Sequence, residues 1–353
     1  ECSSEAIADF EKILSSFFTN LEDSLKLHGK IDSRTSPALM YSFVEINEDL
    51  YWEAVRQKVE ISDRIKKISG INKMTLNSEW GLIGASSAMA WKPHADSTWE
   101  LVAWRYPKNV GRKRRISSSI VKEMELNHPE TFVNRDPTKE KGLIAPRTPC
   151  PVLYGIRGSS SQAVLSAHEW LQSNPEVEKC QRFAIHRTNQ LSDDHITGFS
   201  TSTVLTNPIE TKGAHSSLEV IFMGSSKTLV AFKEGGEVNR LLRKLIPGDK
   251  ISWMGLESPD GSIHLERLRV DSPVPRVTGR PVCCNNKTMR SAGNNQPLRC
   301  DFCPKIIEKH WQFKEIDLTD LELIGGWVEP PPSQRRHLSR PLSLGEPILS
   351  HSD

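Results

Sequence analysis

Four of the seven cysteines are gathered in one short stretch, between Cys283 and Cys303. Cys300 and Cys303 have the C-x-x-C spacing that lets two thiolates bind one tetrahedral metal ion. Cys283 and Cys284 are adjacent, and adjacent cysteines seldom reach the same ion because no turn separates them. All four are candidate zinc ligands, but we expect only one of the first pair to join Cys300 and Cys303, with His310 as a conceivable fourth ligand. A three-thiolate site and a metal-free hairpin are the alternatives.

A second group of reactive side chains lies in the segment HRTNQLSDDHI, residues 186–196. Asp193 and Asp194, next to His195, could bind magnesium or orient a reacting group. The structural alternative is that Asp193, or the serine before it, caps a helix. Arg187 and Asn189 lie two residues apart in an extended segment, so they should point to one face. That face is suited to a nucleotide or a phosphate.

Two glycine-containing segments could bind an anion. TPCPVLYGIRGSSSQ, starting at residue 148, predicts a strand, a glycine loop with Gly155 and Gly158, and the start of a helix. EWGLIGASSAMAW, residues 79–91, places Gly81 and Gly84 near a helix N-terminus. An ordinary turn is the alternative for the first of them. The basic run GRKRR, residues 111–115, is typical of a solvated loop or of phosphate contact.

The elements that must position these residues indicate several domains of mixed α+β type. The chain has 353 residues, of which 37% are apolar and 25% charged, with a net charge of +2, which describes a globular protein. It has no run of 18 or more apolar residues, so we expect no membrane span. Between residues 200 and 272 the pattern predicts three strands, a helix and two strands, the order of an OB-fold barrel. The proline-rich segment 329–347 predicts a disordered tail or an extended arm.

Cysteine usage and the absence of a signal peptide lead us to expect reduced thiols and a cytoplasmic protein. The chain begins with Glu1 and enters a helical pattern at once. We therefore expect that a segment upstream has been lost.

Several motifs, in this order, resemble one family, the archaeal tRNA(Ile)-agmatidine synthetases (TiaS). They are GLIGA, WRYP, TPCPVLYGIRG, RTNQLSDDH, KTMRSAG and RRHLSRPL. The likeness extends over nearly the whole chain, and the third and fourth motifs are the most specific. It implies a ferredoxin-like domain at 1–145, the remainder of a split kinase-like domain at 146–199, an OB-fold at 200–275, a zinc-ribbon-like hairpin at 276–325 and a C-terminal arm at 326–353.

The resemblance also implies an activity. The family uses ATP, with Mg²⁺, to activate carbon 2 of the wobble cytidine of the isoleucine tRNA with anticodon CAU, and agmatine then takes the place of the activated oxygen. The modified tRNA reads AUA as isoleucine. The implied roles are catalytic for Arg157, Arg187, Asp193, Asp194 and His195; substrate-binding for Gly81, Gly84, Gly155, Gly158 and Asn189; and nucleic-acid-binding for Arg112, Lys113, Arg114, Lys212, Arg240 and Arg243. Within the first set, the arginines would neutralise phosphate charge and the carboxylates would bind metal or agmatine.

Two departures from the family pattern stand out. The acidic stretch GIDDTD with which members begin is missing, so half of the ATP site is expected to be absent and the activity of this chain alone is in question. The first cysteine knuckle is one residue short, which places Asn285 opposite the second thiolate.

Two other functions fit parts of the sequence. One is a non-catalytic protein that binds tRNA or single strands through the barrel and the ribbon. It leaves the motifs at 148–158 and 187–195 unexplained. The other is a degenerate relative that kept the fold and lost catalysis.

Overall fold

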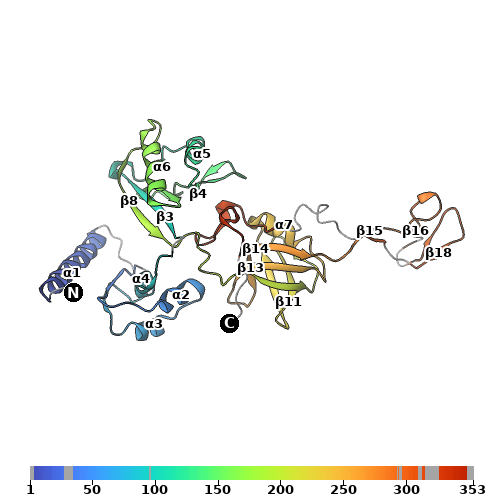
Figure 1. Cartoon of the computed structure of the whole chain (residues 1–353), viewed down its shortest axis with the longest axis horizontal. Coiled ribbons are helices and arrows are strands. Elements are labelled where there is room, and N and C mark those ends of the chain that lie inside the picture. The colour runs from blue at the N-terminus through green and yellow to red at the C-terminus, as the bar shows by residue number, and fades with distance from the viewer. Residues whose placement is uncertain are drawn as a thin grey trace.

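The computed structural model describes residues 4–27, 35–94, 97–291, 293, 296–308, 312–314 and 326–347. The molecule is elongated and of mixed α+β type, with two α/β parts at one end, a barrel in the middle and a small cysteine-bearing hairpin at the other end (Figure 1). This confirms the predicted fold class in its coarse form.

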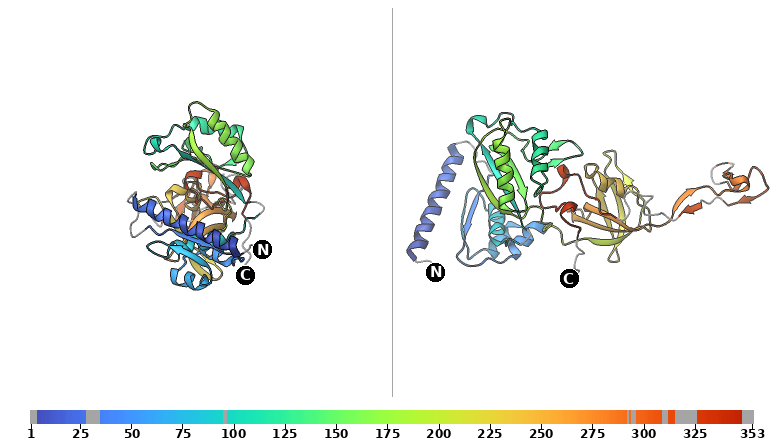
Figure 2. Two further views of the ribbon diagram at one scale, coloured as in Figure 1. Left: turned by 90° about the vertical axis from the view of Figure 1, so that its left-hand side faces the viewer. Right: turned by 45° about the horizontal axis from the view of Figure 1, so that its top comes forward.

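The N-terminal unit consists of helices around a two-stranded antiparallel sheet. Its elements are α1 (Ser4–Leu27), β1 (Ala38–Tyr41), α2 (Asp49–Arg56), α3 (Ile61–Lys67), β2 (Asn72–Thr75) and α4 (Gly81–Ala90). The amphipathic α1 lies along the outside of the unit (Figure 2). It contacts the unit through the rings of Phe10 and Tyr41. The core of the unit comprises Leu50, Tyr51, Ile68, Leu82 and Ala90.

The second unit is a four-stranded sheet with two helices, and it corrects a predicted domain boundary. Its elements are β3 (Thr98–Arg105), α5 (Ser118–Asn127), β4 (Thr131–Phe132), β7 (Val152–Gly158), α6 (Ser161–Ser173) and β8 (Cys180–Thr188), with a small hairpin of β5 (Arg135–Asp136) and β6 (Lys141–Gly142). The sheet order is β4-β7-β3-β8, and β3 pairs with both β7 and β8. A boundary between residues 145 and 146 would therefore divide one sheet, so 146–199 is not a separate domain.

The reason for this error is that strand pairing is non-local. β3 is a buried strand whose two neighbours come more than forty residues later, and local sequence pattern does not reveal which strands pair. The helices cover one face of this β-α-β-β-α-β unit. Leu101, Ile156, Val164 and Leu171 are fully buried between the sheet and the helices.

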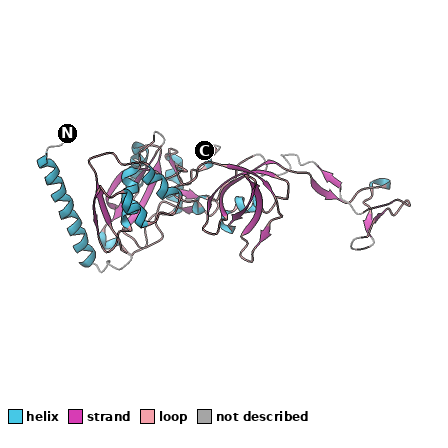
Figure 3. Cartoon of the chain, turned by 90° about the horizontal axis from the view of Figure 1, so that it is seen from below, coloured by secondary structure: helices cyan, strands magenta, loops and turns pink. Residues whose placement is uncertain are grey.

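A closed barrel follows, and the short β10 is a strand that the predicted order of three strands, a helix and two strands does not include. It comprises β9 (Ser200–Val204), β10 (Ile209–Glu210), β11 (Ser216–Phe222), β12 (Ser225–Ala231), α7 (Glu237–Leu242), β13 (Lys250–Glu257) and β14 (Ile263–Ser272). The order is β10-β11-β12-β14-β13-β9, and a further pairing of β9 with β11 closes the sheet (Figure 3). Leu241 and Leu242 of α7 pack into the core together with Leu229 and Leu268.

The C-terminal part leaves the barrel and then returns to it. β15 (Arg276–Gly279) and β19 (Gln312–Lys314) form a two-stranded stalk, and beyond it lie β16 (Arg290–Ser291), β17 (Leu298–Arg299) and β18 (Ile306–Ile307). The segment 326–347, which we call the C-terminal arm, then packs between the barrel and the second unit. Val328 pairs with Leu268 of β14, and the backbone carbonyls of His337 and Leu338 accept N–H groups of Leu191 and Asp193. Of the two expectations for this segment, the structure shows an ordered arm.

Candidate functional site

The segment 189–198, which we call the SDDH loop, lies where the N-terminal unit, the barrel and the C-terminal arm meet. It leaves the end of β8 as a compact turn in which Leu191 and Asp193 have positive φ angles of 60° and 63°. In the described part of the chain no helix begins here, so the helix-cap alternative is wrong. The turn directs each of its acidic and basic side chains toward a different part of the protein.

Asp193 faces the barrel. Its carboxylate accepts two hydrogen bonds from Arg267 of β14, at 2.7 and 3.0 Å, and a third from the backbone N–H of Arg340, at 2.7 Å. The Arg267 side chain is almost fully buried, with 4% exposure. Both carboxylate oxygens are thus engaged by groups that hold the three parts of the protein together. This leaves Asp193 poorly placed to bind a metal ion or agmatine.

Asp194 faces the N-terminal unit. One of its carboxylate oxygens accepts the hydroxyl hydrogen of Tyr51 at 2.5 Å, and its carbonyl accepts the Nε–H of Arg56 at 3.0 Å. Asn189 donates from its amide to the same Tyr51 hydroxyl at 2.9 Å. Burial, together with the bond to Asp194, raises the pKa of Tyr51, so this phenol stays protonated and donates. The structure therefore brings the side chains of Asn189 and Asp194 to the same hydroxyl group.

His195 faces inward. Its Nε2 lies 3.0 and 3.1 Å from the two carboxylate oxygens of Glu266 on β14, and its Nδ1 is buried without a hydrogen-bond partner in the described residues. Glu266 also accepts from Ser339 and pairs with Arg336 at 2.7 Å. Burial alone would raise the pKa of Glu266, but His195, Ser339 and Arg336 together keep it below its ordinary value.

The two predicted phosphate-binding arginines lie on different strands and have different surroundings. Arg157 of β7 is mostly buried, bonds to Gln190 and lies 3.3 Å from Glu100; burial lowers its pKa. Arg187 of β8 is exposed and donates to the backbone carbonyl of His94. Their partners on β3, Glu100 and Trp99, are adjacent residues, so the side chains of Arg157 and Arg187 lie on opposite faces of the sheet and do not meet at one point.

The four glycines also differ. A Cβ on Gly81 would lie 2.2 Å from the Ser36 carbonyl oxygen, so α4 can start against β1 only with glycine there. A Cβ on Gly158 would lie 2.9 Å from Val164 Cγ1, and one on Gly155 would lie 3.1 Å from a carboxylate oxygen of Glu100. Gly84 has open space around it. For Gly81 and Gly158, close packing accounts for the glycine.

The basic residues separate into exposed and buried positions. Arg112 and Lys113 are exposed, but all five N–H donors of Arg114 are used by the backbone carbonyls of Pro146, Thr148, Cys150 and Val152. Arg114 has no donor left for a phosphate, and it instead closes the loop before β7. On the barrel Lys212 is exposed, Arg240 pairs with Glu237 and Arg243 pairs with Glu210.

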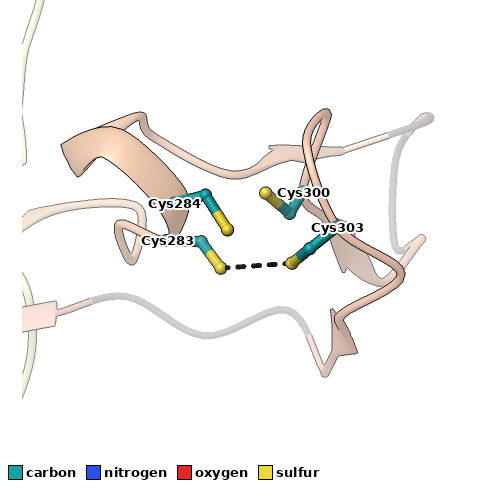
Figure 4. A group of neighbouring side chains, drawn as sticks. All are labelled: Cys283, Cys284, Cys300 and Cys303. Atoms are coloured by element: carbon teal, nitrogen blue, oxygen red, sulfur yellow. Dashed lines mark hydrogen bonds between the residues drawn. The ribbon is translucent and has the colours of Figure 1, made fainter.

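The four clustered cysteines converge, which corrects our expectation that one of the adjacent pair would be left out. Their sulfur atoms all lie within 4.8 Å of one another, and those of Cys283 and Cys303 are 3.7 Å apart (Figure 4). Four thiolates at ~2.3 Å from one zinc ion are about 3.8 Å apart, so the set fits a tetrahedral site. The required turn is made after the pair, where Asn285 and Asn286 have φ angles of 57° and 55°.

A backbone hydrogen bond lowers the pKa of one of these thiols. The N–H of Phe302 donates to Cys300 Sγ at 3.3 Å and lowers the pKa of this thiol to about 6. His310, the conceivable fourth ligand, lies outside the described residues. With four sulfurs present, a histidine is not needed to complete the set.

A hollow of about 490 Å³ borders the SDDH loop, and its walls come from three parts of the chain. They include Arg56 of α2, Asp193 and Asp194 of the loop, and Arg340 and Glu346 of the C-terminal arm. Sequence reasoning missed Tyr51, Arg56, Arg267 and Glu266, the partners that determine what each SDDH side chain can do. The local sequence does not distinguish a tyrosine or arginine with such a role from any other in a helix or strand.

Comparisons with known proteins place this geometry in a family. The TiaS FLD domain family model matches residues 79–195, a range that contains the whole β4-β7-β3-β8 sheet and most of the SDDH loop. The isoleucine-tRNA 2-agmatinylcytidine synthetase TiaS of Methanosarcina mazei is 32% identical over 82% of this chain and 71% of its own length. This chain belongs to the TiaS family.

The family includes relatives that are longer than this chain. The chain spans 64% of the length of TiaS from Archaeoglobus fulgidus, to which it is 33% identical over 278 residues. Among solved structures, the complex of TiaS with its isoleucine tRNA, AMPCPP and agmatine is similar with a TM-score of 0.69 and 26% identity, covering 86% of this chain and 74% of that one. Within the described residues, no helix is both long and apolar enough to cross a membrane.

Proposed function

We propose that this chain takes part in the ATP-dependent conjugation of agmatine to carbon 2 of the wobble cytidine in the CAU-anticodon isoleucine tRNA. The observation that carries the proposal is the SDDH loop, which holds a carboxylate at a hollow walled by three parts of a TiaS-family chain. A relative of known structure is described in complex with an isoleucine tRNA, AMPCPP and agmatine, which supplies the substrates. In this reaction the oxygen on carbon 2 leaves as phosphate, and the primary amine of agmatine takes its place.

The site residues divide into two roles under this proposal. Asp194 is the carboxylate for the cationic agmatine, because among the described residues only the Tyr51 hydroxyl donates to its carboxylate. Arg187, exposed at the end of β8, supplies positive charge for a phosphate. Asp193 and His195 position the loop through Arg267 and Glu266 of the barrel, and Arg157 positions it through Gln190. Magnesium, which accompanies ATP in phosphoryl transfer, would be bound by the nucleotide phosphates together with carboxylates of the whole site.

The fold supports a matching set of domains. We propose that residues 98–188 form the ferredoxin-like domain. We also propose that the barrel, leaving out the short β10, is an OB-fold, since β12 pairs with β14 and β9 pairs with β13. The remainder of the kinase-like domain is the N-terminal unit at 35–91, to which the SDDH loop is bonded through Tyr51 and Arg56.

Zinc has a structural role in this proposal. Bound by Cys283, Cys284, Cys300 and Cys303, it would hold together a ribbon-like hairpin whose strands are only two residues long. The candidates for the tRNA backbone are exposed Arg112, Lys113 and Lys212, together with Arg240 and Arg243, whose ion pairs are open to solvent.

The test is incorporation of radiolabelled agmatine into the isoleucine tRNA transcript, with ATP and the purified chain. A parallel binding competition compares this tRNA with the elongator methionine tRNA, which has the same anticodon, at one salt concentration. We expect preference for the isoleucine tRNA and incorporation that depends on ATP. Equal, salt-sensitive binding to both tRNAs and to any single strand, without incorporation, would identify a general nucleic-acid-binding protein instead.

A further inference from the structure

A second hollow, of about 200 Å³, lies between the second unit and the C-terminal arm and has no role in the chemistry assigned so far. Among the described residues it shares no lining residue with the hollow at the SDDH loop, although Leu191 of that loop forms part of its wall. We call it the arm hollow. It is lined among others by Val133, Arg157, Leu191, Ser333, Arg335 and Arg336.

Three arginines line the arm hollow, whereas no carboxylate of the described residues does. Arg157 comes from β7 with its side chain 16% exposed, and Arg335 of the C-terminal arm is buried to a similar degree, at 13%. Arg336, the next residue of the arm, is 52% exposed. Positive charges on buried groups act through a medium of lower effective dielectric constant than water, so together they favour an anion in the hollow.

Arg157 uses only part of its guanidinium group to hold the protein together. Its Nε bonds to Gln190, and its Nη2 pairs with Glu100 at 3.3 Å. Neither partner lines the arm hollow. In the described part of the chain Nη1 has no acceptor, and it is not among the fully buried atoms without a partner. This nitrogen is therefore available to a ligand in the hollow.

The two arginines of the arm are engaged in the same partial way. Arg335 donates from Nε to the carbonyl of Pro330 and pairs through Nη2 with Glu329 at 2.7 Å. Arg336 pairs through Nε with Glu266 at 2.7 Å. Both carboxylates lie outside the walls of the arm hollow, and the remaining amino groups of the two arginines have no acceptor among the described residues. The hollow is thus bordered by N–H donors that are still free to bind.

The wall of the arm hollow also contains strained backbone. Val133, directly after β4, has a φ of 57°, in the left-handed region that a β-branched residue rarely adopts. Such outliers cluster at ligand-binding and active sites, because the surrounding structure must hold them in place. A strained valine beside three arginines is therefore a second indication of a ligand site.

We propose that the arm hollow binds an inorganic phosphate or pyrophosphate ion. The planar forks of arginine match the oxygens of a phosphate group, and a hollow of about 200 Å³ suits a small ion better than a nucleotide. The ion would connect β7 with the C-terminal arm. Both already bond the SDDH loop, Arg157 through Gln190 and the arm through the carbonyl of His337, which accepts the N–H of Leu191. The bound ion would therefore steady this loop from the side opposite to its own hollow.

The test places a charge in the wall without removing any existing ion pair. Val133→Asp adds a carboxylate, and aspartate tolerates a φ of 57° better than valine does, so the fold should be kept. Val133→Asn is the matched control, with the same shape and no charge. Arg336→Gln, at a half-exposed position, is the second variant. Equilibrium dialysis of the whole chain with ³²P-labelled pyrophosphate, and separately with orthophosphate, gives the dissociation constants at one ionic strength, and circular dichroism confirms folding.

We expect Val133→Asp to weaken binding of the ion about tenfold or more, because it brings a like charge to the site. Arg336→Gln should also weaken binding, and Val133→Asn should bind as the unchanged chain does. Equal binding by the Val133→Asp and Val133→Asn proteins, or no binding by the unchanged chain, would show that the proposal is wrong. If Val133→Asp weakens binding of a single-stranded RNA but not of the ion, the hollow belongs to an RNA phosphate, which also overturns it.

The outcome does not depend on the proposed function, because the dialysis contains no RNA, ATP or agmatine. Agmatine incorporation is measured on the same proteins in a separate assay. Ion binding that Val133→Asp loses and Val133→Asn keeps supports the arm hollow even where no protein transfers agmatine. Incorporation by all of them, together with equal ion binding, leaves the proposed function standing without the arm hollow.

Discussion

The contact between Asp193 and Arg267 should be a main source of stability at the junction of the three parts, and Asp193→Asn tests this. The substitution keeps the shape of the side chain and removes its charge. Arg267 would then remain in a site where its side chain is 4% exposed, with the groups around it unchanged. The backbone N–H of Arg340 would also lose a charged acceptor at 2.7 Å.

The size of the effect follows from the burial of the pair. Removing one partner of a buried ion pair costs about 3–5 kcal/mol, because the remaining charge is left unpaired. The Asp193 side chain is 19% exposed and asparagine can still accept one hydrogen bond, so we expect about 2–4 kcal/mol. In a unit of 150–250 residues this lowers the unfolding temperature by roughly 4–16 °C.

The assay is thermal unfolding followed by circular dichroism, with Asp194→Asn as the matched control. Asp194 is the next residue in the same loop, and asparagine can still accept the Tyr51 hydroxyl hydrogen, so we expect this variant to lose less than about 1 kcal/mol. A double variant, Asp193→Asn with Arg267→Met, should recover part of the loss because it no longer buries an unpaired charge. Equal unfolding temperatures for the two single variants would refute the reasoning.

Three further predictions follow from individual sites. The purified chain should bind one zinc ion per molecule. In a chelator competition, Cys284→Ser should lose zinc as readily as a serine variant of any other cysteine in the cluster. If Cys284→Ser retains zinc as well as the unchanged chain does, Cys284 is not a ligand. Arg114→Ala should lower the unfolding temperature, whereas Lys113→Ala should change only the affinity for RNA and its salt dependence. An unfolding temperature that falls for Lys113→Ala but not for Arg114→Ala would contradict the hydrogen bonds described. Burial lowers the pKa of His168 to about 4, so His168 stays neutral in the folded protein, whereas it takes up a proton near pH 6.5 in the unfolded chain. The free energy of unfolding should therefore be highest above pH 6.5 and fall by up to ~3 kcal/mol as the pH drops toward 4. Unfolding curves of His168→Gln should lack this dependence of stability on pH.

The sequence alone determined the features that depend on near neighbours. The strands of the barrel were suggested by short apolar runs between turn residues, and the helix before β13 by its amphipathic pattern and the Pro-Gly pair that follows it. The SDDH loop was predictable because so many reactive side chains in eleven residues are unusual on a structural strand. The cysteine cluster followed from the spacing of Cys300 and Cys303.

Only the tertiary structure decided which of these residues are available for chemistry. Asp193 and Asp194 are adjacent and chemically identical, but the turn between them directs one to Arg267 on the barrel and the other to Tyr51 on α2. The run that contains Arg114 looks uniform in sequence, yet the carbonyls that engage Arg114 come from a loop more than thirty residues later. The physical reason is the same in both cases: a charged side chain is committed by the partners that folding brings to it, and those partners are distant along the chain.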